Sequence, residues 1–226
     1  MNRHAVMAVV GTAALVVATS PIAGCEKAVP PISAIVFDVG GVLSKDMIDT
    51  KLIDLARSYN LDTGAVMEVR DRYRDRADLG QVSDDMFWNE LLEHFGVSAT
   101  PQDVEIDSYL ELVDGTLDVA KVLSQTYRTA ILSNDSREMS ALRRRKFGFD
   151  TVFSTIVISA EVGVKKPDPT IYRVLLDRLG VPANECVFID NNQANVDAAK
   201  SLGMQAIRFE SAPQLREALA AMGISM

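Results

Sequence analysis

Cysteine and positive charge are both scarce in this chain. Two cysteines in 226 residues exclude a disulfide framework as the main support of the fold. The 23 lysines and arginines are outnumbered by 31 acidic residues, and the formal net charge of -8 argues against nucleic acid as a partner. No internal repeat or low-complexity segment is evident, so a repeat architecture is not expected either.

The composition is otherwise that of an ordinary globular protein. The chain is 48% hydrophobic and 24% charged, and its length allows one large domain, or a domain with an insert, around an ample core. One of the cysteines, Cys186, begins an apolar segment, so we expect it to be a small buried hydrophobic residue. The negative balance does not exclude a phosphorylated substrate, because the local field of a site matters more than the total charge.

The first 25 residues differ from the rest of the chain. Arg3 and the amino terminus form a short positive region, and residues 5–19 are uncharged and rich in alanine and valine. Small residues then precede Cys25. This pattern is typical of a bacterial lipoprotein signal peptide over residues 1–25, with cleavage before Cys25 and lipidation of its thiol. It predicts a lipid-anchored protein of the cell membrane, on the exported face.

Two alternatives apply to the same segment. Residues 5–25 carry no charge and are just long enough to span a bilayer, so they could form an uncleaved amino-terminal anchor. The start of the chain could also be overextended. In that case a cytoplasmic protein begins near Pro30.

After the first 25 residues, the sequence pattern changes from one typical of helices to one in which strands and helices alternate. Residues 33–39 form a continuous apolar run, as expected of a strand buried on both faces of a parallel sheet. Residues 46–112 show helical spacing, with one helix capped at Asp62 and running through Tyr73 and another beginning at Ser83. Beyond them, short apolar strands alternate with helices. We expect strands at 129–133, 152–158, 185–190 and 205–209, and helices at 117–125, 136–146, 170–179, 193–202 and 213–221.

This alternation predicts an α/β fold, a doubly wound parallel sheet of the Rossmann-like kind. Since the first strand belongs with the later block, the helical stretch is an insertion. We therefore expect a core domain made of residues 31–44 and 114–226, with a helical cap formed by residues 45–113.

Polar side chains stand at the ends of three expected strands. Asp38, Ser133 and Asp190 all fall at carboxyl ends, where open parallel sheets place their ligands. A carboxylate such as Asp38 can attack phosphorus and form an aspartyl-phosphate, which splits hydrolysis into two steps. The purely structural interpretation is that Asp38 and Asp190 cap the turn or helix that follows each of them.

Two further segments suit the binding of a phosphoryl group. The Ser133 hydroxyl and the backbone N–H groups from Asn134 onward could bind phosphoryl oxygens, although one residue of 133–136 is also expected to cap the next helix. Lys166 would neutralise the charge on the phosphoryl group and on Asp38. The structural alternative for Lys166 is a solvated lysine in a loop.

Taken in order, four segments resemble the haloacid dehalogenase-like hydrolase superfamily, whose commonest members are Mg-dependent phosphatases. The resemblance covers residues 33–210 and rests on four ordered motifs: Phe37-Asp38-Val39-Gly40-Gly41-Val42-Leu43, Ile131-Leu132-Ser133-Asn134, Gly163-Val164-Lys165-Lys166-Pro167-Asp168-Pro169 and Val187-Phe188-Ile189-Asp190-Asn191-Asn192. The first motif and Gly80-Gln81-Val82-Ser83 look most like the branch with a small helical cap that includes sugar-phosphate phosphatases. The context favours Lys166 over Lys165 as the site lysine.

The resemblance implies roles for these residues. Asp38 would be the nucleophile, and Ser133, Asn134 and Lys166 would bind the phosphate. Mg²⁺ would be held by the carboxylates of Asp38 and Asp190 and the backbone carbonyl of Gly40, because magnesium takes few protein oxygens and keeps waters for the substrate. The expected partner is a small phosphorylated metabolite such as a sugar phosphate, and the cap would select it. By residue type, Arg70, Tyr73 and Trp88 are the cap candidates.

Two positions depart from the family pattern. Most phosphatases of the family carry a second aspartate where this chain has Gly40, and that group protonates the leaving oxygen and later activates water. General acid–base catalysis typically supplies about 10²–10⁴-fold, so Asp135 or a good leaving group such as an anomeric phosphate would have to compensate. Asn191 stands where a second metal-binding aspartate is usual, so we expect weak Mg²⁺ binding, carried more by Asp190.

These departures leave two other functions open. Metal-free 2-haloacid dehalogenases of the same superfamily use the same nucleophile and a cap arginine, a position near that of Arg70. They have a tyrosine where Gly40 stands and nothing acidic at Asp190, and the arginines around Arg70 suit a solvated helix face. The other function is that of a catalytically weak, membrane-tethered binding protein.

Overall fold

The computed structural model describes residues 31–45, 47–98, 100 and 104–226. The expected signal peptide, including Cys25, lies outside these residues. Within the described part of the chain, no helix is both long enough and apolar enough to cross a membrane.

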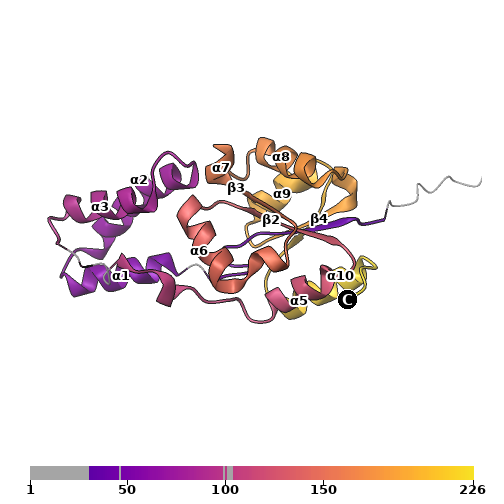
Figure 1. Ribbon diagram of the computed structural model, residues 1–226, viewed down its shortest axis with the longest axis horizontal. Helices are drawn as coiled ribbons and strands as arrows, with labels where there is room; N and C mark the ends of the chain where they lie inside the picture. The colour runs from indigo at the N-terminus through magenta and orange to yellow at the C-terminus, as the bar shows by residue number, and fades with distance from the viewer. Residues whose placement is uncertain (1–30, 46, 99, 101–103) are drawn as a thin grey trace, which may run out of the picture.

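A five-stranded parallel sheet forms the centre of the larger part of the molecule (Figure 1). Its strand order is β3-β2-β1-β4-β5, and every neighbouring pair is parallel. The strands are β1 (Ala34–Phe37), β2 (Arg128–Ser133), β3 (Thr155–Ile158), β4 (Cys186–Asp190) and β5 (Gln205–Arg208). The predicted doubly wound α/β core is therefore confirmed, since these five strands are the ones expected from the apolar runs.

Helices cover both faces of this sheet. The core helices are α5 (Thr116–Leu123), α6 (Arg137–Phe147), α7 (Ser159–Val162), α8 (Pro169–Leu179), α9 (Gln193–Ser201) and α10 (Ala212–Ala221), with short 3₁₀ turns η2 (Phe149–Thr151) and η3 (Ala183–Glu185). Ile35 and Phe37 of β1 pack in one hydrophobic cluster with α5 and α10, while Ala34 and Val36 pack in another with α8 and α9. Successive residues of β1 thus serve opposite faces, which explains its unbroken apolar run.

The cysteine of β4 belongs to the α8 and α9 side of the core. Cys186 is fully buried there as a free thiol, as expected of a small hydrophobic residue. Burial, with the nearby charge of Glu185, raises the pKa of the Cys186 thiol to about 12. The thiol therefore stays protonated and serves packing only.

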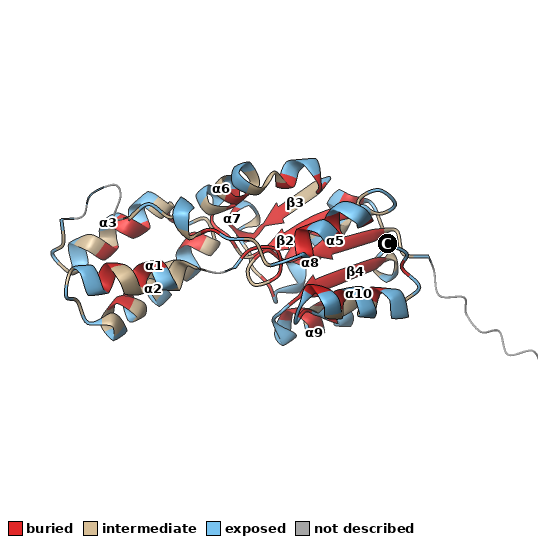
Figure 2. Cartoon of the chain, turned by 90° about the horizontal axis from the view of Figure 1, so that it is seen from below, coloured by how far each residue is buried: buried red, intermediate tan, exposed pale blue. Residues whose placement is uncertain are grey.

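A separate group of helices lies beyond the carboxyl edge of the sheet (Figure 2). It consists of α1 (Ile48–Ser58), α2 (Thr63–Asp78) and α3 (Asp84–His94), followed by the turn η1 (Asp107–Tyr109). We call α1 to α3 the cap. It has its own hydrophobic cluster, in which Leu52, Val69 and Leu91 are almost completely buried. Because the cap has this core of its own, its position over the sheet depends on a small set of contacts with the larger part.

Helix α2 is longer than the sequence pattern indicated. It was expected to run through Tyr73, but it continues to Asp78 because no helix breaker occurs before Gly80. Gly80 has a φ of +68°, and a Cβ built there would lie 2.3 Å from the backbone oxygen of Ala160. Glycine is required at this position, both for its backbone conformation and for the close approach of cap and core.

Candidate active site

Lys166 joins two carboxylates at the carboxyl edge of the sheet. Its Nζ donates hydrogen bonds to Asp38 Oδ1 and Asp190 Oδ2, both at 2.7 Å, and to the backbone oxygen of Leu132 at 2.9 Å. Asp38 directly follows β1, Asp190 ends β4, and Leu132 lies in β2. The parallel register brings them together, because Phe37 pairs with both Ile131 and Ile189.

Burial makes the electrostatics of this cluster strong. Lys166, Asp38 and Asp190 expose 3%, 7% and 0% of their surface, and two carboxylates share one ammonium. Burial, together with the neighbouring Asp190 charge, outweighs Lys166 and raises the pKa of Asp38 to about 6. Burial opposes the charge of Lys166, but the Asp38 and Asp190 carboxylates outweigh it and raise the Lys166 pKa above its ordinary value. Lys166 therefore stays charged, and the cluster carries a net negative charge once Asp38 ionises.

Asn134 holds the backbone of the Lys166 loop. Its side-chain amide donates to the Lys166 carbonyl oxygen at 3.0 Å and accepts from the Lys166 N–H at 2.8 Å. The amide expected at the phosphate site thus positions the lysine with its side chain. Ser133, the other expected phosphate ligand of this strand end, is 2% exposed at the end of β2.

Replacing Asn134 with alanine should remove both of these hydrogen bonds. We expect the free energy of unfolding to fall by about 1–3 kcal/mol, because buried backbone groups of Lys166 lose their partners. Turnover should also fall, since the lysine loop would no longer be fixed. Urea unfolding and steady-state kinetics measure the two effects. Ser154→Ala, which removes a hydroxyl far from Lys166 that donates to the Thr129 carbonyl, is the control and should leave turnover unchanged.

Both oxygens of Asp190 accept hydrogen bonds. The Asn192 N–H donates to Oδ1 at 2.7 Å, and the Asn195 amide donates to Oδ2 at 3.0 Å. The helix cap of α9 is Asn192, whose side chain accepts from the Ala194 N–H. Asp190 is therefore not the cap of this helix, and its buried charge faces Lys166 and Asp38.

The Asn191 side chain lies against the turn that follows Asp38. A Cβ on Gly41, whose φ is +76°, would come within 2.3 Å of Asn191 Nδ2. Within the described residues, no group of three or more histidine, cysteine or acidic side chains could hold a metal ion. A metal at this edge would therefore depend on two carboxylates supplemented by amide or backbone oxygens.

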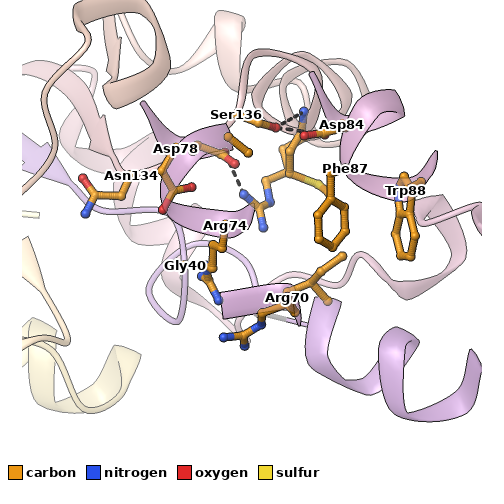
Figure 3. A pocket seen from close by; sticks show the side chains of 14 residues that line it. Gly40, Arg70, Arg74, Asp78, Asp84, Phe87, Trp88, Asn134 and Ser136 are labelled. Atoms are coloured by element: carbon orange, nitrogen blue, oxygen red, sulfur yellow. Dashed lines mark hydrogen bonds and ion pairs between the residues drawn. The ribbon is translucent and has the colours of Figure 1, made fainter. Parts of the chain in front are cut away.

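A pocket of about 100 Å³ lies between the cap and the sheet edge (Figure 3). Gly40 and Asn134 connect it to the ends of β1 and β2. Its lining comes from Gly40, Ile48, Arg70, Arg74, Ala77, Asp78, Asp84, Phe87, Trp88, Asn134, Asp135, Ser136, Met139 and Arg143. Of the cap candidates named by residue type, Arg70 and Trp88 are among these residues and Tyr73 is not.

Arg70 does not belong to a solvated helix face. Its side chain is 13% exposed and forms ion pairs with Asp49 and Asp71. Its Nε is buried and has no hydrogen-bond partner among the described residues. The solvated-face interpretation applies instead to Arg72 and Arg76, which are exposed.

Three aspartates line the pocket, and the sequence pattern indicated only one of them as a site group. Asp135 forms an ion pair with Arg143 at 2.7 Å. Burial raises the pKa of Asp78 and of Asp84 to about 6 each. Asp84 accepts a hydrogen bond from Ser136 at 2.9 Å (Figure 3). Because Ser136 is the N-terminal capping residue of helix α6, this bond links the cap to the core. Asp78 and Asp84 lie on either side of Gly80-Gln81-Val82-Ser83, and this position was the sequence feature that could have indicated them as site residues.

Cap and core are also tied by a second lysine. Lys165 forms an ion pair with Asp75 of α2, while its neighbour Lys166 turns into the sheet edge. The structure thus assigns the two adjacent lysines to different places. Arg137 adds a hydrogen bond from α6 to the Gly80 carbonyl at 3.2 Å.

Comparison with known proteins gives relatives that include a phosphatase and haloacid dehalogenases. A phosphatase from Mycobacterium tuberculosis is 28% identical over 202 residues, covering 82% of this chain and 91% of the relative. An (S)-2-haloacid dehalogenase from a Pseudomonas strain is 27% identical over 201 residues, covering 79% and 85%. An (S)-2-haloacid dehalogenase from Burkholderia cepacia is 32% identical over 96 residues, a match that spans only 42% of the length of each chain.

Solved structures share the fold. A HAD family enzyme from Bacteroides thetaiotaomicron superimposes with a TM-score of 0.71 at 20% identity, covering 80% of this chain and 95% of that one. Further structures of that enzyme contain magnesium and inorganic phosphate. The family description that matches residues 32–203 is haloacid dehalogenase-like hydrolase. Since this match covers well over half of the sequence, the chain belongs to the haloacid dehalogenase-like hydrolases.

Proposed function

We propose that this hydrolase is a Mg²⁺-dependent phosphatase acting on a small phosphorylated metabolite, with a sugar phosphate as the first class to test. The observation that carries the proposal is the buried pair of carboxylates, Asp38 and Asp190, sharing the single ammonium of Lys166. Such a cluster has excess negative charge away from water, which a divalent cation would offset. Metal-free chemistry would leave the negative charge that Asp190 adds to this cluster without a cation to offset it.

The donor set fits magnesium. Asp38 and Asp190 supply carboxylates, the Gly40 backbone supplies a carbonyl, and the Asn191 amide can add a neutral oxygen. Hard oxygen ligands, few in number, are what this ion takes from proteins. When bound, Mg²⁺ would neutralise charge on the transferring phosphoryl group. A relative of the same fold that binds magnesium and inorganic phosphate supports this assignment.

The chain's own residues provide the other parts of a phosphoryl transfer. A carboxylate oxygen of Asp38 attacks phosphorus, and the bond from phosphorus to the leaving oxygen breaks. Lys166 stays charged and stabilises the charge on the equatorial oxygens, while Ser133 and the backbone at Asn134 bind them. Water then releases phosphate from Asp38. The cap covers the site, and the small pocket it forms with the core suits a small substrate.

Hydrolysis of p-nitrophenyl phosphate tests this function. We expect turnover by the purified protein in Mg²⁺, a large loss in EDTA, and recovery when Mg²⁺ is returned. An Asp38→Asn variant should be inactive under all three conditions. Turnover that survives both EDTA and loss of Asp38 would contradict the proposal, whereas metal-dependent turnover would justify a screen of sugar phosphates.

Arg70 supports a second candidate, 2-haloacid dehalogenation. It is nearly buried and lines the same pocket as Gly40, as a cap arginine near a leaving halide would. Relatives of similar identity carry that activity. Halide release from 2-chloropropionate without added metal would favour it. A well-folded protein inactive on both substrates would favour the third alternative, a binding protein.

A further inference from the structure

The site described above lacks a group that moves protons. A phosphomonoester needs a proton on its leaving oxygen, and the aspartyl-phosphate needs a base to activate water. Gly40 has no side chain to do either. Ser133 and Lys166 are assigned to stabilising the negative charge of the phosphoryl group. Asp190 accepts hydrogen bonds from Lys166, Asn192 and Asn195. The missing group must therefore come from the other wall of the pocket.

Three carboxylates line the pocket, and their partners distinguish them. Asp135 forms an ion pair with Arg143 at 2.7 Å, so its negative charge is already paired with a cation. Asp84 accepts the Ser136 hydroxyl at 2.9 Å. Asp78, the last residue of α2, receives no hydrogen bond from any described residue, and it lines the same pocket as Gly40 and Asn134 (Figure 3).

Building on the proposed phosphatase function, we propose that Asp78 is the general acid and base of the reaction, supplied by the cap in place of the side chain that Gly40 lacks. The geometry supports this role because Gly40, two residues after the nucleophile Asp38, and Asp78 line the same small cavity. A carboxyl group on the cap also reaches its place only when cap and core are docked. Proton transfer would then be coupled to enclosure of the substrate.

The surroundings of Asp78 suit a proton carrier. Burial raises its pKa to about 6, and the charges that face it are Arg74, Asp135, Lys165 and Asp75. The two cations lower the pKa and the two carboxylates raise it, so burial decides the direction. A carboxyl group with a pKa near neutrality can both give and take a proton at the pH where the enzyme works.

A second observation supports ligand binding in this pocket. Arg143 also lines it, is 8% exposed, and has a buried Nε with no hydrogen-bond partner among the described residues. Leaving a buried N–H without an acceptor is energetically unfavourable. An oxygen of a bound substrate would satisfy it.

In the proposed reaction, Asp78 first gives up a proton and then regains one. As Asp38 attacks phosphorus, the protonated Asp78 gives its proton to the leaving oxygen, so an alcohol departs and Asp78 becomes a carboxylate. Asp78 then takes a proton from water as the water oxygen attacks phosphorus. The bond between phosphorus and the Asp38 oxygen breaks, which releases inorganic phosphate and restores both side chains.

The test compares Asp78→Asn with Asp84→Asn and with Asp85→Asn, all in the full chain with Mg²⁺. Asp85 is an exposed neighbour outside the pocket and serves as the matched control. Two substrates are used, p-nitrophenyl phosphate, whose leaving group needs no proton, and glycerol phosphate, whose leaving group does. Stopped-flow kinetics give the first release of p-nitrophenolate, steady-state kinetics give turnover, and thermal melting confirms folding.

We expect Asp78→Asn to release the first p-nitrophenolate at nearly the wild-type rate but to turn over about 10²–10⁴-fold more slowly on both substrates, because hydrolysis of the aspartyl-phosphate loses its base. Asp85→Asn should match the wild type.

Three results would overturn the role of Asp78 while leaving the proposed function standing. They are wild-type turnover in Asp78→Asn, an equal loss in the first release and in turnover, which indicates a structural role, and the expected pattern in Asp84→Asn instead. A wild-type chain without Asp38-dependent turnover would overturn the proposed function, and Asp78 would lose its role with it.

Discussion

Replacing Lys166 with methionine should lower the free energy of unfolding by about 3–5 kcal/mol at pH 7.5 and abolish turnover. Methionine keeps an unbranched side chain as far as Cε and lacks only the terminal nitrogen, so it leaves Asp38 and Asp190 as two buried carboxylates without the ammonium between them. Breaking a buried pair from one side is costly because the remaining charge is uncompensated. Urea unfolding and p-nitrophenyl phosphate hydrolysis measure the two effects.

The pH dependence of this variant gives the prediction a second check. A carboxyl group whose pKa is raised on folding stabilises the protein below its unfolded pKa and loses that contribution as pH rises through the folded value. Asp38, at about 6 even beside Lys166, behaves in this way. The loss in free energy of unfolding caused by Lys166→Met should therefore become smaller as the pH is lowered from 7.5 to 5. A loss that did not change with pH would contradict the explanation by uncompensated carboxylate charge.

Lys165→Met is the matched control for Lys166→Met. It removes the adjacent lysine, whose ion pair with Asp75 is partly exposed to water. Such pairs contribute about 0–1 kcal/mol, so we expect little change in stability. If the two lysine variants lost the same stability, the buried cluster would not be the reason for the Lys166 effect.

Replacing Asp38 with asparagine should abolish turnover and yet stabilise the protein at pH 7.5. Loss of a covalent nucleophile typically costs on the order of 10⁴–10⁶ in kcat. The same change removes one of two carboxylates that compete for Lys166. Since each unit of raised pKa corresponds to about 1.4 kcal/mol, the free energy of unfolding should rise by up to about 2–3 kcal/mol.

Asp190→Asn is the informative comparison, because it should change stability in the opposite direction. Asp190 is fully buried and accepts hydrogen bonds from Lys166, Asn192 and Asn195. An amide cannot accept all of them, so unpaired buried donors would remain. Thermal melting of the two variants side by side decides the point. A loss of stability in Asp38→Asn would show that Asp38 is held by more than its charge.

The sheet and the order of the motifs along its edge could be predicted from the sequence. A strand buried on both faces of a parallel sheet shows an unbroken apolar run, so β1 and β4 could be located, and the residue that ends such a run falls at the ligand-binding edge. Asp38 and Asp190 were found in this way. The start of α3 was also predictable, because Ser83 caps it through a local hydrogen bond to the Met86 N–H.

How these groups interact depends on contacts that form only in the folded chain. That one ammonium serves both carboxylates depends on the register of three strands, and that the Asn134 side chain holds the Lys166 loop depends on a contact across 32 residues. The role of Asp78 depends on how the cap docks on the sheet edge. Hydrophobic periodicity is a local property that reports which face of an element is buried. The pKa of a carboxyl group and the partner of a lysine depend instead on charges brought close by folding, which local sequence does not encode.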